Sequence, residues 1–196
     1  MIAFRPNELY THEEIYRSLS VGNAGGIRLK TDDSGRVRRA ILLTSVPTAR
    51  MAAENPYHDR VEGDVLVYTG AGQEGDQALG GRNQRLLEQP AQGFPIYCFL
   101  LIESRRSKQH GPRRWRFLGL LRFIRHYKET QVDVRGGIRS VWIFEFRVLS
   151  GFDCVSPDYD VRMMVDILAE QQKNDPLVPY RPTRPIKNKL FRRHVA

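Results

Sequence analysis

The stretch that decides the fold is YHDRVEGDVLVYTGAGQEGDQALGGRNQRLL, residues 57–87. Its segment DVLVYTG is rich in β-branched and aromatic residues, which predicts a buried strand running into a glycine-rich loop. The run GAGQEG at residues 70–75 spells GxGxxG, which holds a dinucleotide pyrophosphate when a helix follows the strand. Two more glycines in ALGG (78–81) interrupt the next turns, and only a short helix over 83–88 is expected. A dinucleotide site is therefore not expected.

The segments on either side of this stretch predict a strand-rich chain. Thr11 and Glu14 have the spacing of a capping box, which predicts a short helix over residues 13–19. A turn is expected at 33–35, a loop over 47–63, and a β-bulge near Gly119. Further strands are expected at residues 26–29, 37–43, 95–103, 114–127 and 140–149.

Many short strands with few helices indicate an α+β fold that is mainly β. The even spacing of the strands predicts a curved antiparallel sheet that closes into a barrel, with a few flanking helices. Ser156 and Pro157 are a good start for a last helix, whose apolar stripe runs to Leu168. We therefore expect one domain over residues 1–173. Residues 174–196, rich in proline and basic side chains, are expected to form a linker or tail.

The charge of the chain favours an acidic partner. Among 196 residues, 31 Lys and Arg against 22 Asp and Glu give a net charge of +9, and nucleic acid is the commonest partner of such a chain. Two basic clusters are predicted to contact phosphates. The residues of these clusters that are predicted to bind phosphate are Lys30, Arg36, Arg105, Arg106, Lys108, Arg113 and Arg114.

The sequence gives little support for a membrane, secreted, zinc-binding or disulfide-rich protein. No apolar run approaches the roughly 20 residues of a membrane span, and MIAFRPNELYTHEE is no signal peptide, so a cytoplasmic, nucleoid-associated location is expected. Cys98 and Cys154 lie far apart without a nearby histidine pair, which excludes a zinc module and a disulfide framework. No cofactor, metal or catalytic residue is predicted. An autonomous nuclease that uses Asp59, Asp64 or Asp76 with a divalent ion remains an alternative.

Residues 57–87 resemble the SRA (SET- and RING-associated, or YDG) domain family. Its members carry a tyrosine and an aspartate before a glycine, a strand that ends in Tyr-Thr-Gly, and an Asn-Arg-like segment that opens a short helix. A looser resemblance extends over residues 21–149. It implies an SRA/PUA-like β-barrel that binds double-stranded DNA and rotates 5-methylcytosine or 5-hydroxymethylcytosine out of the duplex into a pocket.

The resemblance also implies roles for individual residues. Tyr68 and Tyr57 would stack on the two faces of the base, and Asp59 would accept a hydrogen bond from its N4 amine. The pocket is completed by Thr69, which would meet the pyrimidine edge, and by Gly70 and Gly72, which let the backbone come close. Two loops would enter the grooves of the DNA, with Asn23 and Arg28 on the first and Gln73, Gln77, Arg82 and Asn83 on the second.

The resemblance extends to the context of the chain. Bacterial members are often followed by an HNH nuclease, and the terminal NKLFRRHVA is similar to the basic segment that leads into it. This implies the specificity domain of a modification-dependent restriction endonuclease, which binds DNA without cutting it, and leaves open a homodimer of the full-length nuclease. The alternative within nucleic-acid binding is an RNA-binding domain of the PUA or ASCH type.

Overall fold

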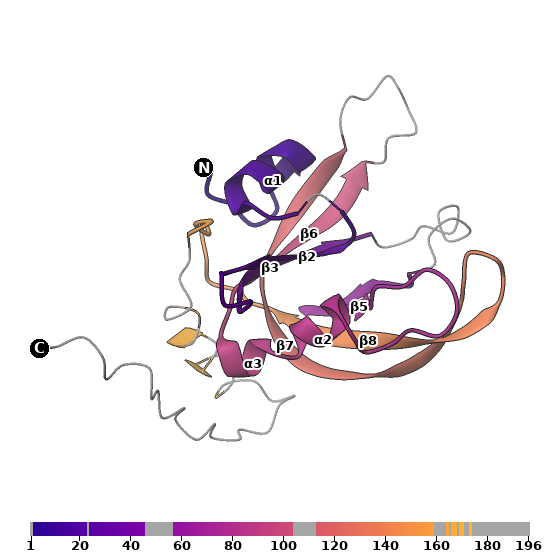
Figure 1. Ribbon diagram of the computed structural model, residues 1–196. Helices are drawn as coiled ribbons and strands as arrows, with labels where there is room; N and C mark the ends of the chain where they lie inside the picture. Colours follow the sequence, from indigo (N-terminus) through magenta and orange to yellow (C-terminus); the bar gives the residue numbers. More distant parts are fainter. Residues whose placement is uncertain are drawn as a thin grey trace, which may run out of the picture.

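The computed structural model describes residues 2–22, 24–45, 57–103 and 113–158, together with 164, 166, 167, 169, 170 and 173. These residues form one eight-stranded sheet and three short helices (Figure 1). In chain order the elements are β1 (Leu9–Thr11), α1 (His12–Leu19), β2 (Ile27–Thr31), β3 (Val37–Thr44), β4 (Arg60–Glu62), β5 (Val65–Thr69), α2 (Arg82–Leu86), α3 (Gln89–Gln92), β6 (Ile96–Glu103), β7 (Arg114–Val132) and β8 (Ile138–Val148).

The sheet is strongly curved but not closed. Its order is β2-β3-β6-β7-β8-β5-β4, with β1 added against β7, and its strands pair antiparallel except for the parallel pair β3–β6. We call β2, β3 and β6 the first limb and β8, β5 and β4 the second limb; β7 joins them. The two end strands, β2 and β4, do not pair with each other, so the expectation of a closed barrel is wrong. Side-chain contacts, described below, connect the limbs instead.

The long strand β7 bends at the predicted bulge. Cys98 of β6 pairs with Gly119, whereas Phe99 pairs with Phe117, so Leu118 is the extra residue. Gly119 has a φ of 140°, a conformation that favours glycine. The first part of β7 pairs with β6, and the part from Leu121 onwards pairs with β8.

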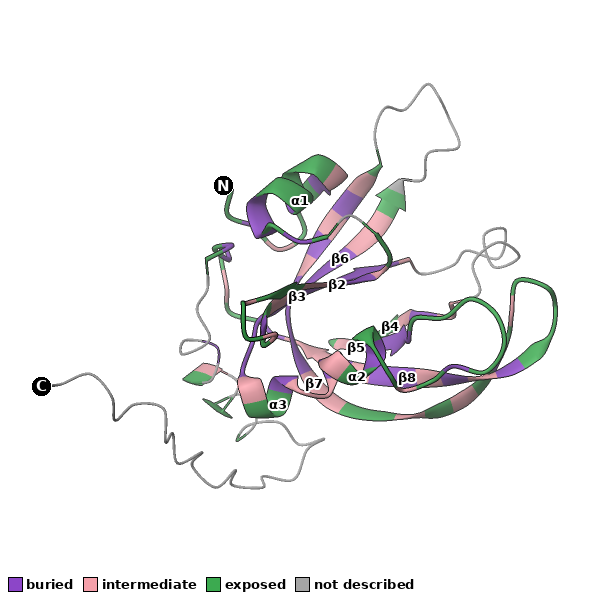
Figure 2. Ribbon diagram, viewed as in Figure 1, coloured by how far each residue is buried: buried purple, intermediate pink, exposed green. Residues whose placement is uncertain are grey.

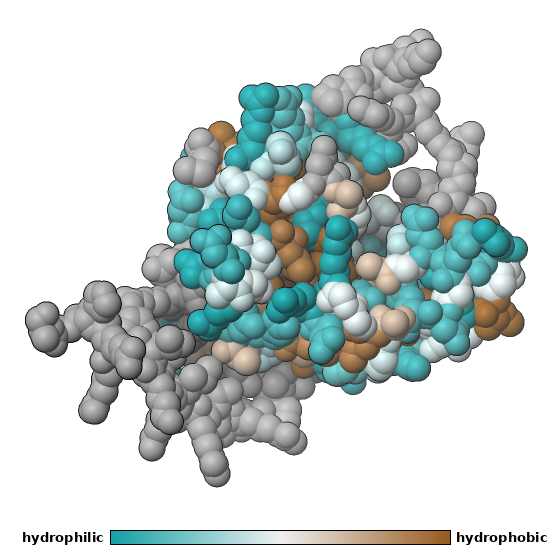
Figure 3. Space-filling model, in the orientation of Figure 1, coloured by the Kyte–Doolittle hydropathy of each residue, from teal (hydrophilic) through white to brown (hydrophobic). Residues whose placement is uncertain are grey.

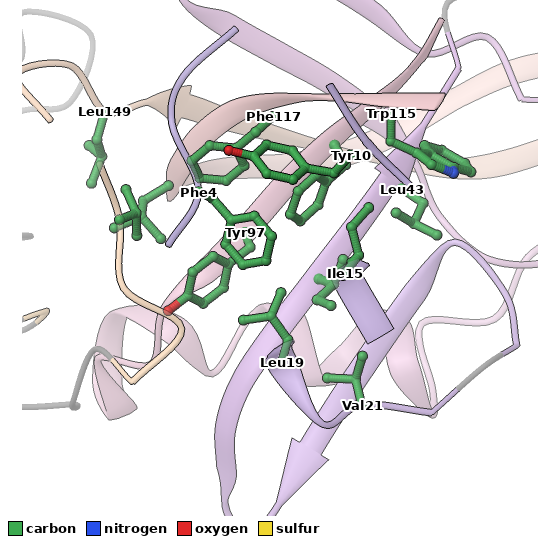
Figure 4. Close-up of a cluster of buried hydrophobic side chains, with 14 of the residues drawn as sticks. Phe4, Tyr10, Ile15, Leu19, Val21, Leu43, Tyr97, Trp115, Phe117 and Leu149 are labelled. Carbon is green, nitrogen blue, oxygen red and sulfur yellow. The ribbon is translucent and has the colours of Figure 1, made fainter. Parts of the chain in front are cut away.

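The buried hydrophobic residues form two large cores and a small third cluster of Val67, Val141 and Ile143. The first packs α1 and the N-terminal segment against β6 and β7 (Figure 4), with the Phe4 ring edge-on to Tyr10 at 5.0 Å between centroids. The capping box that begins α1 is present, since Thr11 Oγ1 accepts from the Glu14 N–H and Glu14 Oε2 accepts from the Thr11 N–H. The second core lies between the sheet and the segment carrying α2 and α3, and contains Leu86 and Phe144 (Figure 2).

The other expected elements agree with the structure apart from a few differences. The expected loop over 47–63 contains β4, and its residues 47–56 lie outside the described part. Helix α3 was not expected. The last helix was expected to start at Ser156 and Pro157, but Pro157 and Asp158 lie in a turn, in which the Ser156 hydroxyl accepts from the Asp158 N–H at 3.1 Å. Each described residue between 164 and 173 is helical, and Met164 is buried. In the described residues, no helix has the length and apolar character needed to cross a membrane.

Candidate functional site

A buried carboxylate connects the two limbs of the sheet. Asp59 precedes β4 and is only 5% exposed. Its Oδ2 accepts from Thr44 Oγ1 at the end of β3 (2.7 Å), and its Oδ1 accepts from the Thr69 N–H at the end of β5 (2.8 Å). The Thr69 hydroxyl and the Ser45 N–H also donate to it. Asp59 therefore spans the gap that strand pairing leaves open.

Burial dominates the electrostatics of Asp59. Loss of hydration disfavours the charged carboxylate and raises its pKa to about 6, although the four hydrogen bonds act in the opposite direction. A buried, hydrogen-bonded carboxylate whose pKa lies near neutral pH is typical of functional sites. Asp59 is therefore the first candidate for a functional residue of this site.

Two tyrosines lie close to Asp59. Tyr68 of β5 is buried on the same sheet face as Phe144, and its hydroxyl reaches the backbone at Gly26. Burial raises the pKa of Tyr68, and the charges of Asp59 and Tyr57 add to this effect. Tyr57 is half-buried, and its hydroxyl oxygen accepts from the Gly72 N–H. The structure thus brings Tyr57, Asp59 and Tyr68 together, even though only one residue separates Tyr57 from Asp59.

The glycine-rich loop after β5 is held by two buried amides. Gln77 donates from Nε2 to the carbonyls of Gly70 (2.7 Å) and Gly72 (3.1 Å), and its Oε1 accepts from the Trp142 N–H. Asn83 accepts from the Ala71 N–H and donates to the Ala71 and Ala78 carbonyls. Their side chains brace the loop and do not project from it. Gln73, in contrast, is exposed.

The two loops expected to contact DNA also contact each other. Arg28 is buried and donates from Nε to the Gly25 carbonyl (3.0 Å), and its Nη1 lies 2.7 Å from His12 Nε2. Arg82, at the start of α2, donates to the Ala24 carbonyl at 3.0 Å. Arg28 therefore supports the first loop from within, and Arg82 ties the second loop to it. Asn23 lies outside the described residues.

The basic residues expected to bind phosphate are spread apart. Lys30 and Arg36 are exposed beside the β2–β3 turn, at the opposite end of β2 from Gly26 and the Tyr68 hydroxyl. At the start of β7, Arg113 is exposed and Arg114 is half-buried. Residues 105, 106 and 108 lie outside the described part of the chain.

Two residues that sequence reasoning missed also contact the residues around Asp59. Gln131 of β7 donates from Nε2 to Thr69 Oγ1 at 3.2 Å, and Arg139 of β8 donates from Nη1 to the Gly72 carbonyl at 2.6 Å. Arg139 also lies over the Tyr57 ring, 6.0 Å from its centroid. No local motif marks these residues. Only the pairing of β7 with β8, which makes Gln131 and Arg139 direct partners, could have indicated them.

Comparison with known families identifies the fold. A family model described as "ScoMcrA-like, SRA domain" matches residues 32–150, more than half of the chain. The chain belongs to this SRA family. A comparison with curated proteins finds no match.

Solved structures with the same fold as this SRA domain include DNA complexes. The SUVH5 SRA domain with fully methylated CG DNA matches with 21% identity and a TM-score of 0.52, covering 78% of this chain and 93% of that one. KRYPTONITE in complex with mCHH DNA, an H3(1–15) peptide and SAH matches with 15% identity and a TM-score of 0.56 (78% and 33%). The MspJI restriction endonuclease with a 27-mer oligonucleotide matches with 19% identity and a TM-score of 0.53 (76% and 37%).

One face of the SRA domain is mixed in character (Figure 3). On the face shown in Figure 3, hydrophobic residues (brown) gather near the middle of the molecule, with hydrophilic residues (teal) around them. Within the described ranges, no group of three or more His, Cys, Asp or Glu side chains is placed to hold a metal ion.

The close approach of Tyr68 to Gly26 gives a prediction. A Cβ at residue 26 would lie 2.6 Å from the Tyr68 hydroxyl oxygen and 3.2 Å from the Leu43 carbonyl oxygen. Gly26→Ala should therefore push the Tyr68 ring out of place and reduce the free energy of unfolding by about 1–3 kcal/mol. Urea denaturation measures this loss. Gly22→Ala is the matched control, because a Cβ there meets nothing within 4 Å; equal stability of the two variants would contradict the contact.

Proposed function

We propose that this SRA domain binds double-stranded DNA that carries a modified cytosine, and that it rotates the modified base into the space beside Asp59. One observation carries the proposal: a buried carboxylate with two tyrosines beside it, at the point where two loops meet. The same-fold structures of SUVH5 and KRYPTONITE in complex with methylated DNA support this choice of partner.

The chemistry of the pocket suits a cytosine. The exocyclic N4 amine is a donor, and carboxylates are its usual partners. Aromatic rings stack on bases with a gain of about 1–3 kcal/mol each, which offsets the few kcal/mol that unstacking the base costs. Tyr68 supplies one such ring within the pocket and Tyr57 the other. Thr69 offers its backbone and hydroxyl to the edge of the pyrimidine.

Binding of the amine requires a local exchange of hydrogen bonds. An ionised carboxylate has about four acceptor sites, and Asp59 already has four donors. The N–H groups of Thr69 and Ser45 belong to the fixed backbone, whereas the hydroxyls of Thr44 and Thr69 can rotate. The base would therefore displace one hydroxyl proton from Asp59 and leave the backbone donors in place.

The loops around the pocket suit the two grooves of the duplex. Gln73 is exposed on the glycine-rich loop and can enter the space that the flipped base leaves. Gln77 and Asn83 would act indirectly, by fixing the shape of that loop. Arg113 and the net charge of +9 favour phosphate contacts. Lys30 and Arg36 are not part of this proposed surface, because they lie at the far end of β2.

We further propose that the domain supplies specificity to a modification-dependent restriction endonuclease. In MspJI, a restriction endonuclease, the matching part is 37% of the chain. The domain would comprise residues 1–173, and residues 174–196 would lead towards a nuclease domain of the HNH type.

A competition titration at physiological salt tests the proposed function. One short duplex carries cytosine, 5-methylcytosine or 5-hydroxymethylcytosine at a CpG on one or both strands. We expect a modified duplex to bind at least about tenfold more tightly than the plain one, or 1.4 kcal/mol. 2-Aminopurine next to the modified base should brighten on binding if the base leaves the stack. Equal affinities across the set would exclude modified-cytosine recognition.

Two further arms of the titration test the alternatives. Single-stranded RNA that competes better than the modified duplex would favour an RNA-binding domain of the PUA or ASCH type. Incubation of plain and modified DNA with Mg²⁺ or Mn²⁺ tests for an autonomous nuclease. Cutting of either DNA by this chain would contradict a role in binding alone.

A further inference from the structure

Resting on the proposed function, we infer that Gln131 and Arg139 are positioning residues that hold the base pocket in the geometry that receives the base. They are direct partners across the β7–β8 pair. Both are buried, with exposures of 3% and 2%. Each contacts a different part of the pocket, so the two together fix it from the side of the second limb.

Gln131 acts on Asp59 through Thr69. Its Nε2 donates to Thr69 Oγ1 at 3.2 Å, which occupies a lone pair of that hydroxyl and leaves the hydroxyl proton to be donated elsewhere. The acceptor of that proton is the Asp59 carboxylate. A second contact, from Gln131 Nε2 to Glu129 Oε1 at 3.1 Å, fixes which end of the amide faces Thr69. Gln131 thus helps to keep the Thr69 hydroxyl oriented towards Asp59.

Arg139 acts on Tyr57 and on the glycine-rich loop. Its Nη1 donates to the Gly72 carbonyl at 2.6 Å, and the Gly72 N–H donates in turn to the Tyr57 hydroxyl. The guanidinium also lies over the Tyr57 ring. Burial of a guanidinium is costly unless its hydrogen bonds and charge are used. In Arg139, Nη1 and the charge are directed at the Gly72 carbonyl and the Tyr57 ring, both of which the proposed function places around the base.

Other contacts join the tip of the β7–β8 hairpin to the same loop. Arg135 forms an ion pair with Glu74 at 3.0 Å, and Asp76 Oδ1 accepts from the Ser140 N–H at 2.7 Å. The hairpin and the glycine-rich loop therefore form one braced unit. Such bracing lowers the cost of ordering the pocket when a base enters.

The first test measures discrimination, the ratio of the affinities for modified and plain duplex. Arg139→Met should lower it about tenfold and Gln131→Met about fivefold, the size of one hydrogen bond to a charged and to a neutral group, respectively. Affinity for plain DNA should stay the same. Arg122→Met and Gln92→Met are the matched controls for Arg139→Met and Gln131→Met, since Arg122 is a buried arginine of β7 and Gln92 a half-buried glutamine of α3. Both controls should discriminate like the wild type.

The second test needs no DNA. The pKa of the Asp59 carboxyl can be followed by ¹³C NMR; Gln131→Met should raise it, because a hydroxyl that is no longer oriented towards the carboxylate stabilises the charged form less. The other titratable groups coupled to Asp59, namely Tyr57, Tyr68 and Cys98, are unchanged in this variant. A role in stability alone would not move this pKa, and Gln92→Met should leave it unchanged.

The outcomes separate this inference from the proposed function. A wild-type protein that does not discriminate between the duplexes would contradict the function, and an unmoved Asp59 pKa in Gln131→Met would overturn the inference in either case. Wild-type discrimination that survives in Gln131→Met and Arg139→Met would overturn the inference alone. If Arg139→Met does not fold, Arg139→Lys takes its place, because it keeps the charge and loses the planar fork; full discrimination there would also overturn it.

Discussion

Replacement of Asp59 by alanine should abolish the preference for modified cytosine, a loss of at least about tenfold in the affinity ratio. The N4 amine of the flipped base would lose its acceptor, and a buried donor without a partner costs about 1–3 kcal/mol. Affinity for plain duplex should change little, because phosphate contacts supply it. The measurement is the competition titration with plain and modified duplexes, repeated at two salt concentrations.

A matched control exists on the same hairpin. Asp64 lies between β4 and β5, is exposed and pairs with Arg147, so Asp64→Ala should retain full discrimination. If Asp59→Ala instead weakens binding to plain and modified DNA equally, Asp59 supports the fold and does not read the base.

Acidification should stabilise the wild-type fold relative to Asp59→Ala. The pKa of Asp59 is about 6 in the folded protein, against about 3.9 for an aspartate in an unfolded chain. The folded state thus holds the proton more tightly, and the stabilisation it gives is complete below the unfolded pKa and is lost as pH rises through about 6. About two pKa units correspond to roughly 3 kcal/mol.

The measurement is urea denaturation of both proteins between pH 4.5 and 7.5, without DNA. The difference in the free energy of unfolding, wild type minus Asp59→Ala, should rise as pH falls from 7 to 4.5. Taking this difference removes the contributions of the other titrating groups. A flat difference would mean that Asp59 keeps an ordinary pKa, and a falling one would mean that its hydrogen bonds outweigh its burial.

Local patterns were sufficient for most individual elements. The capping box of Thr11 and Glu14, the bulge beside Gly119 and the strand before Gly70 each depend on residues close in sequence, and the structure confirms them. The closed barrel was wrong because closure depends on which strands meet at the two ends. Asp59, with donors from β3 and β5, occupies the gap where pairing would have closed the sheet.

The residues of the site also divide into those that a local stretch of sequence reveals and those that only the pairing of distant strands reveals. Tyr57, Asp59 and Tyr68 belong to one short stretch, which made them accessible through a family resemblance. Gln131 and Arg139 come from a distant hairpin, and their contacts depend on a register that no local pattern encodes. Gln77 and Asn83 were expected to contact a DNA groove because their side chains are polar. In the structure these side chains form hydrogen bonds inside the glycine-rich loop.

The pairing of β5 has a consequence for how the chain folds during synthesis. Val65–Thr69 pairs with β4 and with β8, and β8 begins only at Ile138. When the ribosome has released the first limb and the start of β7, β3, β6 and β7 can already pair, whereas Leu149, Val155 and Met164 complete the first core only later. The second limb must wait for β8, and such distant pairings form slowly. The base pocket can therefore mature only after β8 has been released, and a chain stalled before residue 138 would expose Leu66 and Tyr68 to chaperones.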